Sequence, residues 1–204
     1  MLAYLITSPK GCLHPHGLKD KLARAMHKSK AIDVRLAFAC LRYDNSHARG
    51  LLSPHEALLI ESFRRACEDL GLFALLNLTS LKLEILEMLC SEGAPLGIHY
   101  KESDMDLLKA GRPGFLSPKA HVIYSAHSID NAKRALDLGA SYVVLSPIFY
   151  EKNGNKALGL HTLESLDSEL KPGILALGGV TTNERINSLR SSGIAGFASI
   201  SYFD

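Results

Sequence analysis

The sequence predicts an α/β protein whose eight parallel strands close into a (β/α)8 barrel, the TIM barrel, at minimal size. Three observations carry this prediction. Short apolar runs alternate with amphipathic helical segments, which is typical of parallel strands joined by crossover helices. The runs number eight, more than most doubly wound open sheets contain. The turn Thr7–Gly11 after the first run lacks the G-x-G-x-x-G loop with which such open sheets bind dinucleotides.

Composition narrows the class of protein. The 204 residues suffice for one large domain, and we expect residues 1–204 to form it. Apolar residues make up 47% and charged residues 22%, as in ordinary globular proteins. The chain has neither a signal peptide pattern nor an apolar run near the roughly 20 residues that span a bilayer, so we expect a cytoplasmic protein without a membrane partner. The formal charge of +2 is scattered, which argues against a nucleic-acid partner. Four widely spaced cysteines indicate reduced thiols and no zinc site.

The expected strands are short apolar runs, many of them rich in β-branched residues, that end in small or polar residues. They are Leu2–Thr7, Ile32–Leu41, Leu72–Leu76, Leu96–His99, Val122–Ser125, Tyr142–Ser146, Ile174–Leu177 and Gly196–Ser199.

The expected helices lie between these runs. They are Leu18–Lys28, Pro54–Leu70, Leu81–Ser91, Met105–Leu108, Ile129–Leu138, Leu163–Leu170 and Asn183–Ser191. Ser53 and Pro54 form a cap followed by proline at the first helical position, and Ser128 opens another helix. Four glycines stand where helices should stop, namely Gly71, Gly93, Gly139 and Gly193.

The eighth helix is expected to be missing or truncated, because only Ile200–Asp204 follow the last strand. A missing helix exposes an apolar strip of the barrel, which a second copy of the chain is suited to cover. We therefore expect a homo-oligomer, such as a homodimer.

Active groups of such barrels lie at the carboxyl ends of the strands. The last two strands end in Gly178-Gly179 and in Ser199-Ile200-Ser201. Glycines let the backbone approach a phosphate closely, and Thr181 or Thr182 would cap a helix whose N-terminus favours the anion. A glycine pair can also serve only as a tight turn, but together with the serine pair it favours a phosphate site at Gly178, Gly179, Ser199 and Ser201.

Two histidines also follow strands. His127 stands after Ser125 in Ser125-Ala126-His127-Ser128, and a histidine is suited to proton transfer near neutral pH. Its plain alternative is to cap the helix that begins near Ser128. His99 is a weaker candidate, because it can equally be a satisfied core histidine at the barrel mouth.

Three further strand ends carry polar side chains. Arg42 is suited to pairing with a phosphate or carboxylate, or with Asp44 two residues on. Asn77 is suited to contacting a substrate ring or to capping the next helix. Asp104 is a Mg²⁺ ligand only if a second carboxylate helps it, and Glu102 is its obvious neighbour. The polar loop Tyr150–Lys156 is a candidate mobile lid.

In order, LRYD, FALLN, GIHYKESD, YSAHS, YVVLSPIF, KALGL, ILALGGVT and FASIS resemble the thiamin phosphate synthase/TenI superfamily. The resemblance covers nearly the whole chain and is strongest from Gly97 to Ser201. It implies a (β/α)8 barrel and a small thiazole phosphate ligand. The synthase branch joins a pyrimidine diphosphate to a thiazole phosphate with Mg²⁺, whereas the TenI branch aromatises a thiazole phosphate carboxylate by proton transfer.

The departures from the synthase pattern favour the TenI branch. Where synthases have Q-L-R-E-K, this chain keeps Arg42 but has Cys40 and Asp44 in place of the Gln and Lys. Leu78 replaces the aspartate of the synthase Asn-Asp pair, and Tyr150–Gly154 replaces P-T-x-T-K at the diphosphate. Additional acids and fewer cations weaken the binding of a diphosphate.

The resemblance therefore implies a thiazole tautomerase, an isomerase of thiamin biosynthesis that needs no cofactor. His127, a position where synthases often share a histidine, would move the proton, and Arg42, Asn77 and Ser125 would contact the remainder of the substrate. The alternative is a transferase, thiamin phosphate synthase, with Mg²⁺ held through Asp104. A third possibility is a catalytically silent barrel that binds a phosphate metabolite or a protein partner.

Overall fold

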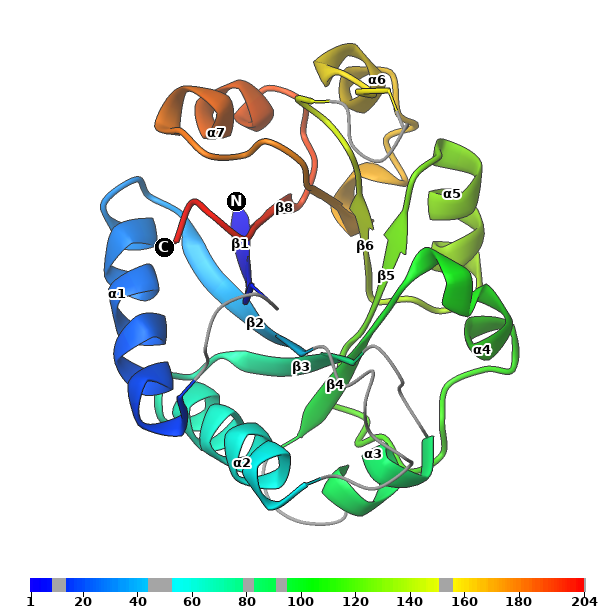
Figure 1. The fold of residues 1–204 in the computed structure, drawn as a ribbon. Coiled ribbons are helices and arrows are strands. Elements are labelled where there is room, and N and C mark those ends of the chain that lie inside the picture. The colour runs from blue at the N-terminus through cyan, green and yellow to red at the C-terminus, as the bar shows by residue number, and fades with distance from the viewer. Residues whose placement is uncertain (9–13, 44–52, 79–82, 91–94, 151–155, 204) are drawn as a thin grey trace.

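A computed structural model describes residues 1–8, 14–43, 53–78, 83–90, 95–150 and 156–203. Eight parallel strands form a closed barrel in chain order, with the helices arranged around its outside (Figure 1). The (β/α)8 class is thereby confirmed. No helix among the described residues combines the length and the apolar character needed to cross a membrane.

The strands are β1 Leu2–Ile6, β2 Arg35–Tyr43, β3 Phe73–Leu78, β4 Leu96–Tyr100, β5 Val122–Ala126, β6 Tyr142–Leu145, β7 Ile174–Ala176 and β8 Gly196–Ser199. The α-helices are α1 Leu18–Lys30, α2 Pro54–Asp69, α3 Leu83–Cys90, α4 Met105–Lys109, α5 Ile129–Asp137, α6 Leu160–Glu164 and α7 Asn183–Arg190. Short 3₁₀ turns are η1 Pro15–Gly17, η2 Glu102–Asp104 and η3 Lys171–Gly173.

Two elements differ clearly from their predicted positions. The second strand begins at Arg35 and not at Ile32, because the backbone first turns through Asp33 at φ 53° and the Val34 N–H bonds back to the Ser29 carbonyl. The sixth helix forms over Leu160–Glu164 and not over Leu163–Leu170, since Gly159 at φ +79° turns the chain into the helix earlier than expected. Glycine adopts that conformation without steric cost.

The predicted helix starts are confirmed at α2 and α5. Ser53 accepts a hydrogen bond from the Glu56 N–H at 3.2 Å, and the Glu56 carboxylate accepts one from the Ser53 N–H at 2.7 Å. This reciprocal capping box satisfies two backbone donors at the start of the helix. Ser128 caps α5 by accepting from the Asn131 N–H at 3.2 Å, so the helix is capped by Ser128 and not by His127.

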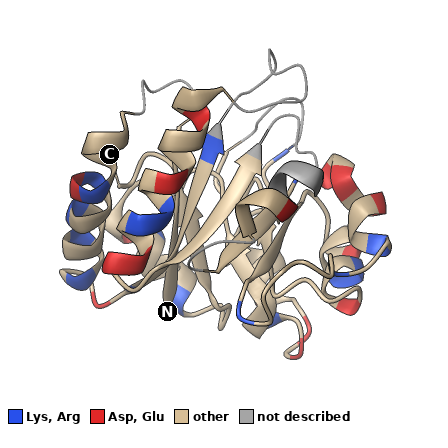
Figure 2. Ribbon diagram, turned by 90° about the horizontal axis from the view of Figure 1, so that it is seen from below, with Lys and Arg blue, Asp and Glu red and all other residues tan. Residues whose placement is uncertain are grey.

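Apolar side chains are buried on both sides of the strand ring. One cluster fills the barrel interior and includes Tyr4, Phe38, Val144 and Leu175. A larger cluster lies between the strands and the surrounding helices. Strand β4 is buried at all five of its residues, as expected when both faces of a parallel strand are covered. The charged residues, coloured blue and red, lie mainly on the outer helices and loops (Figure 2).

The barrel closes where β1 pairs with β8, with Leu2 opposite Gly196. A Cβ atom at Gly196 would lie 2.0 Å from the Leu2 carbonyl oxygen. Only glycine therefore permits this approach of the two backbones.

No α-helix follows β8 in the described part of the chain, whose C-terminal end lies between α1 and α7 (Figure 1). Tyr202 and Phe203 are buried, and the Phe203 ring stacks on Phe197 at 6.1 Å. The ammonium group of Lys28 lies 4.5 Å from the centre of the Tyr202 ring and donates to the Tyr202 carbonyl. The chain thus covers part of the expected apolar strip itself, and homo-oligomerisation stays a prediction.

Gly196→Ala should lower the free energy of unfolding by at least ~2 kcal/mol, because the added methyl group collides with backbone and no side chain can move away to relieve it. Urea unfolding followed by circular dichroism measures the loss. Gly114→Ala is the matched control, since nothing lies within 4 Å of the Cβ position there. Equal stability of the two variants would contradict the role given to Gly196 in closure.

Candidate active site at the carboxyl end of the barrel

A cavity of about 380 Å³ opens at the carboxyl ends of the strands. Side chains or backbone from the ends of all eight strands line it. The structure brings together here every one of the eight predicted site residues, namely Arg42, Asn77, Ser125, His127, Gly178, Gly179, Ser199 and Ser201. Their closeness is a finding, while their roles in binding and catalysis stay predictions.

The orientation of the His127 ring is set by the end of β6. Its Nδ1 lies 2.8 Å from the Ser146 carbonyl oxygen and 3.2 Å from the Ser146 hydroxyl. A carbonyl only accepts hydrogen bonds, so Nδ1 carries the proton of the neutral ring. The other nitrogen, Nε2, is then unprotonated. Because the ring lines the cavity and its side chain is 37% exposed, Nε2 is available as a base.

Glu102 in η2 lies beside this ring. One carboxylate oxygen, Oε1, accepts from the His127 N–H and from the Asn131 side-chain amide, both at 3.0 Å. The second oxygen, Oε2, is 3.8 Å from His127 Nε2. The Tyr124 hydroxyl donates to the Glu102 carbonyl at 2.8 Å. Burial, with the negative charges of Glu102 and Asp104, raises the pKa of Tyr124 to about 12, so this donor keeps its proton.

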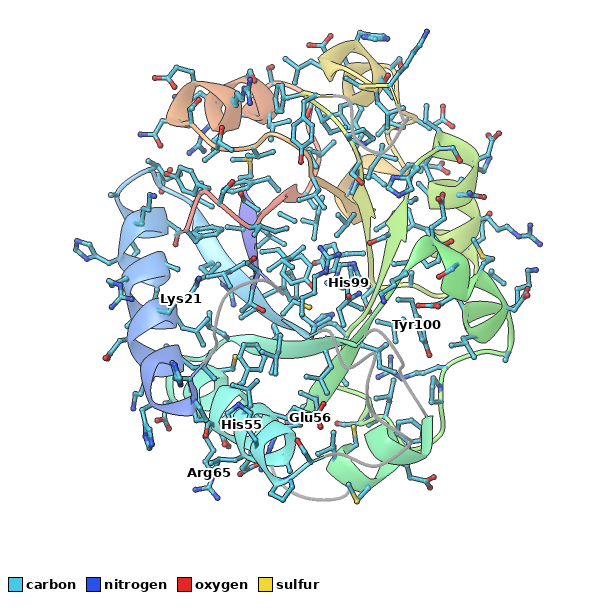
Figure 3. All side chains as sticks on the ribbon, in the orientation of Figure 1. Lys21, His55, Glu56, Arg65, His99 and Tyr100 are labelled. Atoms are coloured by element: carbon cyan, nitrogen blue, oxygen red, sulfur yellow. The ribbon has the colours of Figure 1, made fainter. Side chains whose placement is uncertain are left out.

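A second histidine lies deeper, at the floor of the cavity. His99 is 5% exposed and lies inside the strand ring, whereas His55 lies on the outer helix α2 (Figure 3). Its Nδ1 is 2.7 Å from the Tyr4 hydroxyl, and its Nε2 is 2.8 Å from the Ser125 hydroxyl. Burial, with the positive charges of Arg42 and Lys101, lowers the pKa of His99 to about 3. His99 is therefore a neutral, satisfied core histidine, as one of its two sequence interpretations expected.

The hydrogen bonds of His99 have a preferred direction. Burial raises the pKa of Tyr4 well above its usual value, so its phenol keeps a proton. A phenol donates better to an imidazole nitrogen than to the neighbouring Cys40 thiol, which accepts only weakly. Tyr4 then donates to Nδ1, and Nε2–H donates to Ser125. The Ser125 hydroxyl hydrogen is consequently left to donate to a ligand.

The two polar strand ends before His99 are fixed by the backbone around them. Asn77, which is 6% exposed, donates its amide to the His99 carbonyl at 2.8 Å and so joins the ends of β3 and β4. The Arg42 N–H donates to the Thr7 hydroxyl at 2.9 Å, and the Arg42 side chain reaches the cavity wall. Asp44, the sequence-predicted alternative partner of Arg42, lies outside the described residues, as do residues 151–155 of the candidate lid.

The residues predicted to bind a phosphate lie at the ends of β7 and β8, and their role as a phosphate cradle stays a prediction. Gly178 and Gly179 have φ of +99° and +79°, and a Cβ at Gly178 would lie 2.8 Å from the Pro147 Cα. Side chains are excluded at this turn, so backbone faces the cavity directly. The Ser199 hydroxyl is already engaged, because it donates to the Val180 carbonyl at 2.7 Å and accepts from the Tyr202 N–H at 3.1 Å. Ser199 thus joins the two loops, while Ser201 lies exposed at the rim.

Helix α7 begins at this cradle, with Thr182 as its cap. Thr182, one of the two threonines predicted there, accepts from the Arg185 N–H at 3.4 Å. A helix N-terminus carries positive potential, which favours an anion in the cradle.

Several residues of this region lie outside the eight predicted site residues, among them Lys101, Tyr150 and Arg185. Lys101 and Tyr150 line the cavity. Arg185 donates to the Gly179 carbonyl at 2.6 Å and its guanidinium lies 5.2 Å from the centre of the Phe149 ring, so it holds the glycine turn. A cation in the first turn of a helix opposes the helix dipole, and that conflict was the available sequence signal for Arg185.

The Asp104 carboxylate, the predicted Mg²⁺ ligand of the synthase alternative, is engaged in the turn after β4. The Asp104 carboxylate accepts from the Lys101 N–H at 2.8 Å and from the Ser103 hydroxyl at 3.2 Å, and it does not line the cavity. In the part of the chain that the structure describes, no three acidic, histidine or cysteine side chains converge as metal ligands. Asp104 in this arrangement stabilises the turn after β4.

The low pKa of His99 predicts how stability depends on pH. In the unfolded protein the His99 ring takes up a proton near pH 6.5, whereas in the folded protein it does so only near pH 3. Between these two pH values the unfolded state therefore binds more protons than the folded state. The free energy of unfolding should thus fall by up to about 1.4 kcal/mol per pH unit below pH 6.5 on account of His99. Urea unfolding at pH 7, 6, 5 and 4 measures the slope, and His99→Gln should flatten it. An unchanged slope in His99→Gln would contradict the assignment.

Comparison with known proteins places the chain among its relatives. Residues 88–203 match the family model of thiamine monophosphate synthase. The chain is 35% identical over 111 residues to the "Putative thiamine-phosphate synthase 2" of Aquifex aeolicus, a match that covers 52% of this chain and 56% of that protein. It is 33% identical over 107 residues to the thiamine-phosphate synthase of Prochlorococcus marinus, covering 52% of this chain and 30% of that protein. The matches thus span about half, or less, of the length of these relatives.

A solved structure agrees on the fold. The thiamine phosphate pyrophosphorylase of Pyrococcus furiosus superimposes with a TM-score of 0.63 at 14% identity, covering 97% of this chain and 84% of that one. At this identity the likeness concerns the barrel alone. The matched range of the family model, by contrast, takes in β4–β8 and with them His127, the glycine turn and both serines at the end of β8. The chain therefore belongs to the thiamine monophosphate synthase/TenI family.

Proposed function

We propose that the chain binds a thiazole phosphate in this cavity and aromatises a thiazole phosphate carboxylate by proton transfer, as the TenI branch does. The observation that carries the proposal is the fixed state of His127. Its Nδ1 proton is committed to the Ser146 carbonyl, which leaves Nε2 as a base on the cavity wall. A tautomerase needs one such base, whereas a joining reaction needs a second, diphosphate-binding half of the site.

The phosphate half is supported by the glycine turn and the start of α7. Gly178 and Gly179 leave room for backbone contact, Ser201 adds a hydroxyl at the rim, and Ser199 holds the two loops together. Backbone donors and a helix N-terminus are an established combination for phosphate recognition.

The carboxylate would lie on the other side of the cavity. In a closed ring of eight strands, β3 and β4 lie across from β7 and β8. Asn77 and Lys101 come from this opposite arc, Arg42 comes from the neighbouring strand β2, and all three line the cavity. A ligand with an anion at each end can therefore span the barrel mouth, with its ring beside His127.

The proposed step conserves atoms and electrons. His127 Nε2 takes a proton from one carbon of the substrate, the bonding electrons move into the ring system, and the same proton is returned to a second carbon. The product is an aromatic isomer, so neither oxidant nor metal enters the balance. The Ser125 hydroxyl, which accepts from His99 Nε2–H, would donate its own hydrogen to the charge that develops during this transfer.

Synthase activity is the second candidate, because both curated relatives bear that name. To hold the Mg²⁺ of a synthase, the Asp104 carboxylate would have to give up the hydrogen bond that it accepts from the Lys101 N–H. A silent barrel that only binds the phosphate is the third candidate.

One pair of assays separates the three candidates. The purified protein is mixed with thiazole phosphate carboxylate, and separately with pyrimidine diphosphate, thiazole phosphate and Mg²⁺. We expect isomerisation in the first mixture and no thiamin phosphate in the second. Thiamin phosphate formed at an enzyme-like rate would refute the proposal in favour of the synthase. Turnover in neither mixture, with thiazole phosphate still bound, would show a silent barrel.

His127→Ala should reduce kcat for isomerisation at least ~100-fold, because general base catalysis contributes that much or more. Binding of thiazole phosphate, measured by calorimetry, should change less than about threefold, since the cradle lies on β7 and β8. His55→Ala, on the outer helix α2, is the matched control and should retain full activity (Figure 3). Isomerisation that survives His127→Ala unchanged would disprove the assigned base.

A further inference from the structure

The carboxylate of Glu102 is anomalous in a cavity that binds anions. Among the described residues lining the cavity, Glu102 carries the one negative charge, whereas Arg42 and Lys101 carry positive charges. A carboxylate at this place repels both anionic ends of the proposed substrate, its phosphate and its carboxylate, and so weakens binding. Its presence calls for a compensating role in the reaction.

The contacts of Glu102 show where its charge is directed. The two hydrogen bonds to Oε1, from the His127 N–H and the Asn131 amide, fix the carboxylate against the start of α5. Oε2 is thereby held 3.8 Å from His127 Nε2. The side chains of Glu102 and His127 are both about one third exposed, at 34% and 37%, so water screens their interaction only in part.

The charge of Glu102 matters because Nδ1 of the His127 ring already carries a proton. Nδ1–H is committed to the Ser146 carbonyl, so any proton that the neutral ring accepts must go to Nε2. The imidazolium formed in the transfer then faces Oε2 directly. The negative charge of Glu102 stabilises the protonated ring at this distance. It does not stabilise the neutral ring in the same way, because that ring carries no net charge.

We infer that Glu102 is the positioning residue of the proton transfer, holding the His127 backbone through one oxygen and stabilising the Nε2-protonated ring through the other. This inference rests on the proposed function. It assigns Glu102 to the reaction and not to a metal site, the role that its place beside Asp104 first suggested. It also predicts that substrate affinity and turnover respond to Glu102 in opposite directions.

The other charges around His127 do not duplicate this role. His99 is neutral, with a pKa of about 3. Asp104 is turned toward the Lys101 N–H, and Asp130 lies on α5, in its first turn. Arg42 and Lys101 line the same cavity and oppose a positive charge on the ring. Among the described residues, Glu102 thus supplies the carboxylate that lies beside the His127 ring.

The test is Glu102→Gln, which keeps the shape and an Oε1 acceptor but removes the charge. We expect kcat for isomerisation to fall about tenfold or more, while KM for thiazole phosphate carboxylate stays level or falls. The acid limb of the kcat profile should move to lower pH in the variant, because the protonated form of the His127 ring loses its neighbouring carboxylate. Glu68→Gln, which removes a charge from the exposed face of α2, is the control and should change none of these quantities.

A readout that needs no turnover accompanies the kinetics. The His127 ring, assigned in the NMR spectrum through His127→Asn, is titrated in wild type and in Glu102→Gln. Its midpoint should move to lower pH in the variant, and a midpoint that does not move would overturn the inference. Equal losses of kcat and of substrate affinity would also overturn it, as they would show a structural role. If the wild type fails to isomerise the substrate, the proposed function fails, and the titration still decides the coupling of Glu102 to His127.

Discussion

The structure depends on the closure of the barrel between β1 and β8. That seam allows no side chain at Gly196, where a Cβ would meet the Leu2 carbonyl at 2.0 Å. Once the ring is closed, the carboxyl ends of all eight strands surround one cavity. Residues far apart in the chain, such as Arg42 and Ser201, then line the same space. Without closure, the glycine turn would lie at one edge of a sheet and the cationic strand ends elsewhere along it.

Hydrogen bonds to backbone carbonyls determine the chemistry of the mouth. The Ser146 carbonyl fixes which nitrogen of His127 is protonated, and the His99 carbonyl holds Asn77. The Gly179 carbonyl, in turn, is held by Arg185. Such contacts orient side chains rigidly because the carbonyls belong to strand ends and tight turns that cannot move independently. The site is therefore largely formed before any ligand arrives.

Charge is distributed unevenly around the cavity. Positive side chains occupy the β2 and β4 ends, and the helix N-terminus of α7 adds positive potential beside β7. His99, a buried histidine that lines the cavity, is kept neutral by burial and by those cations. Among the described residues that line the cavity, Glu102 is the exception, and its second oxygen lies 3.8 Å from Nε2 of His127, the proposed base. This pattern underlies the proposal of one substrate with an anionic group at each end.

The sequence by itself determined the barrel, the order of its strands and the eight residues that meet at its mouth. It did so because strand periodicity and glycine or serine at strand ends are local signals, and chain order fixes which ends become neighbours. It missed the start of β2 and the place of α6, which depend on positive-φ turns at Asp33 and Gly159. Only the tertiary structure decided that Ser199 is engaged with Val180, that His99 is neutral and that Glu102 faces His127. Those properties arise from burial and from contacts between residues distant in sequence, which no local pattern records.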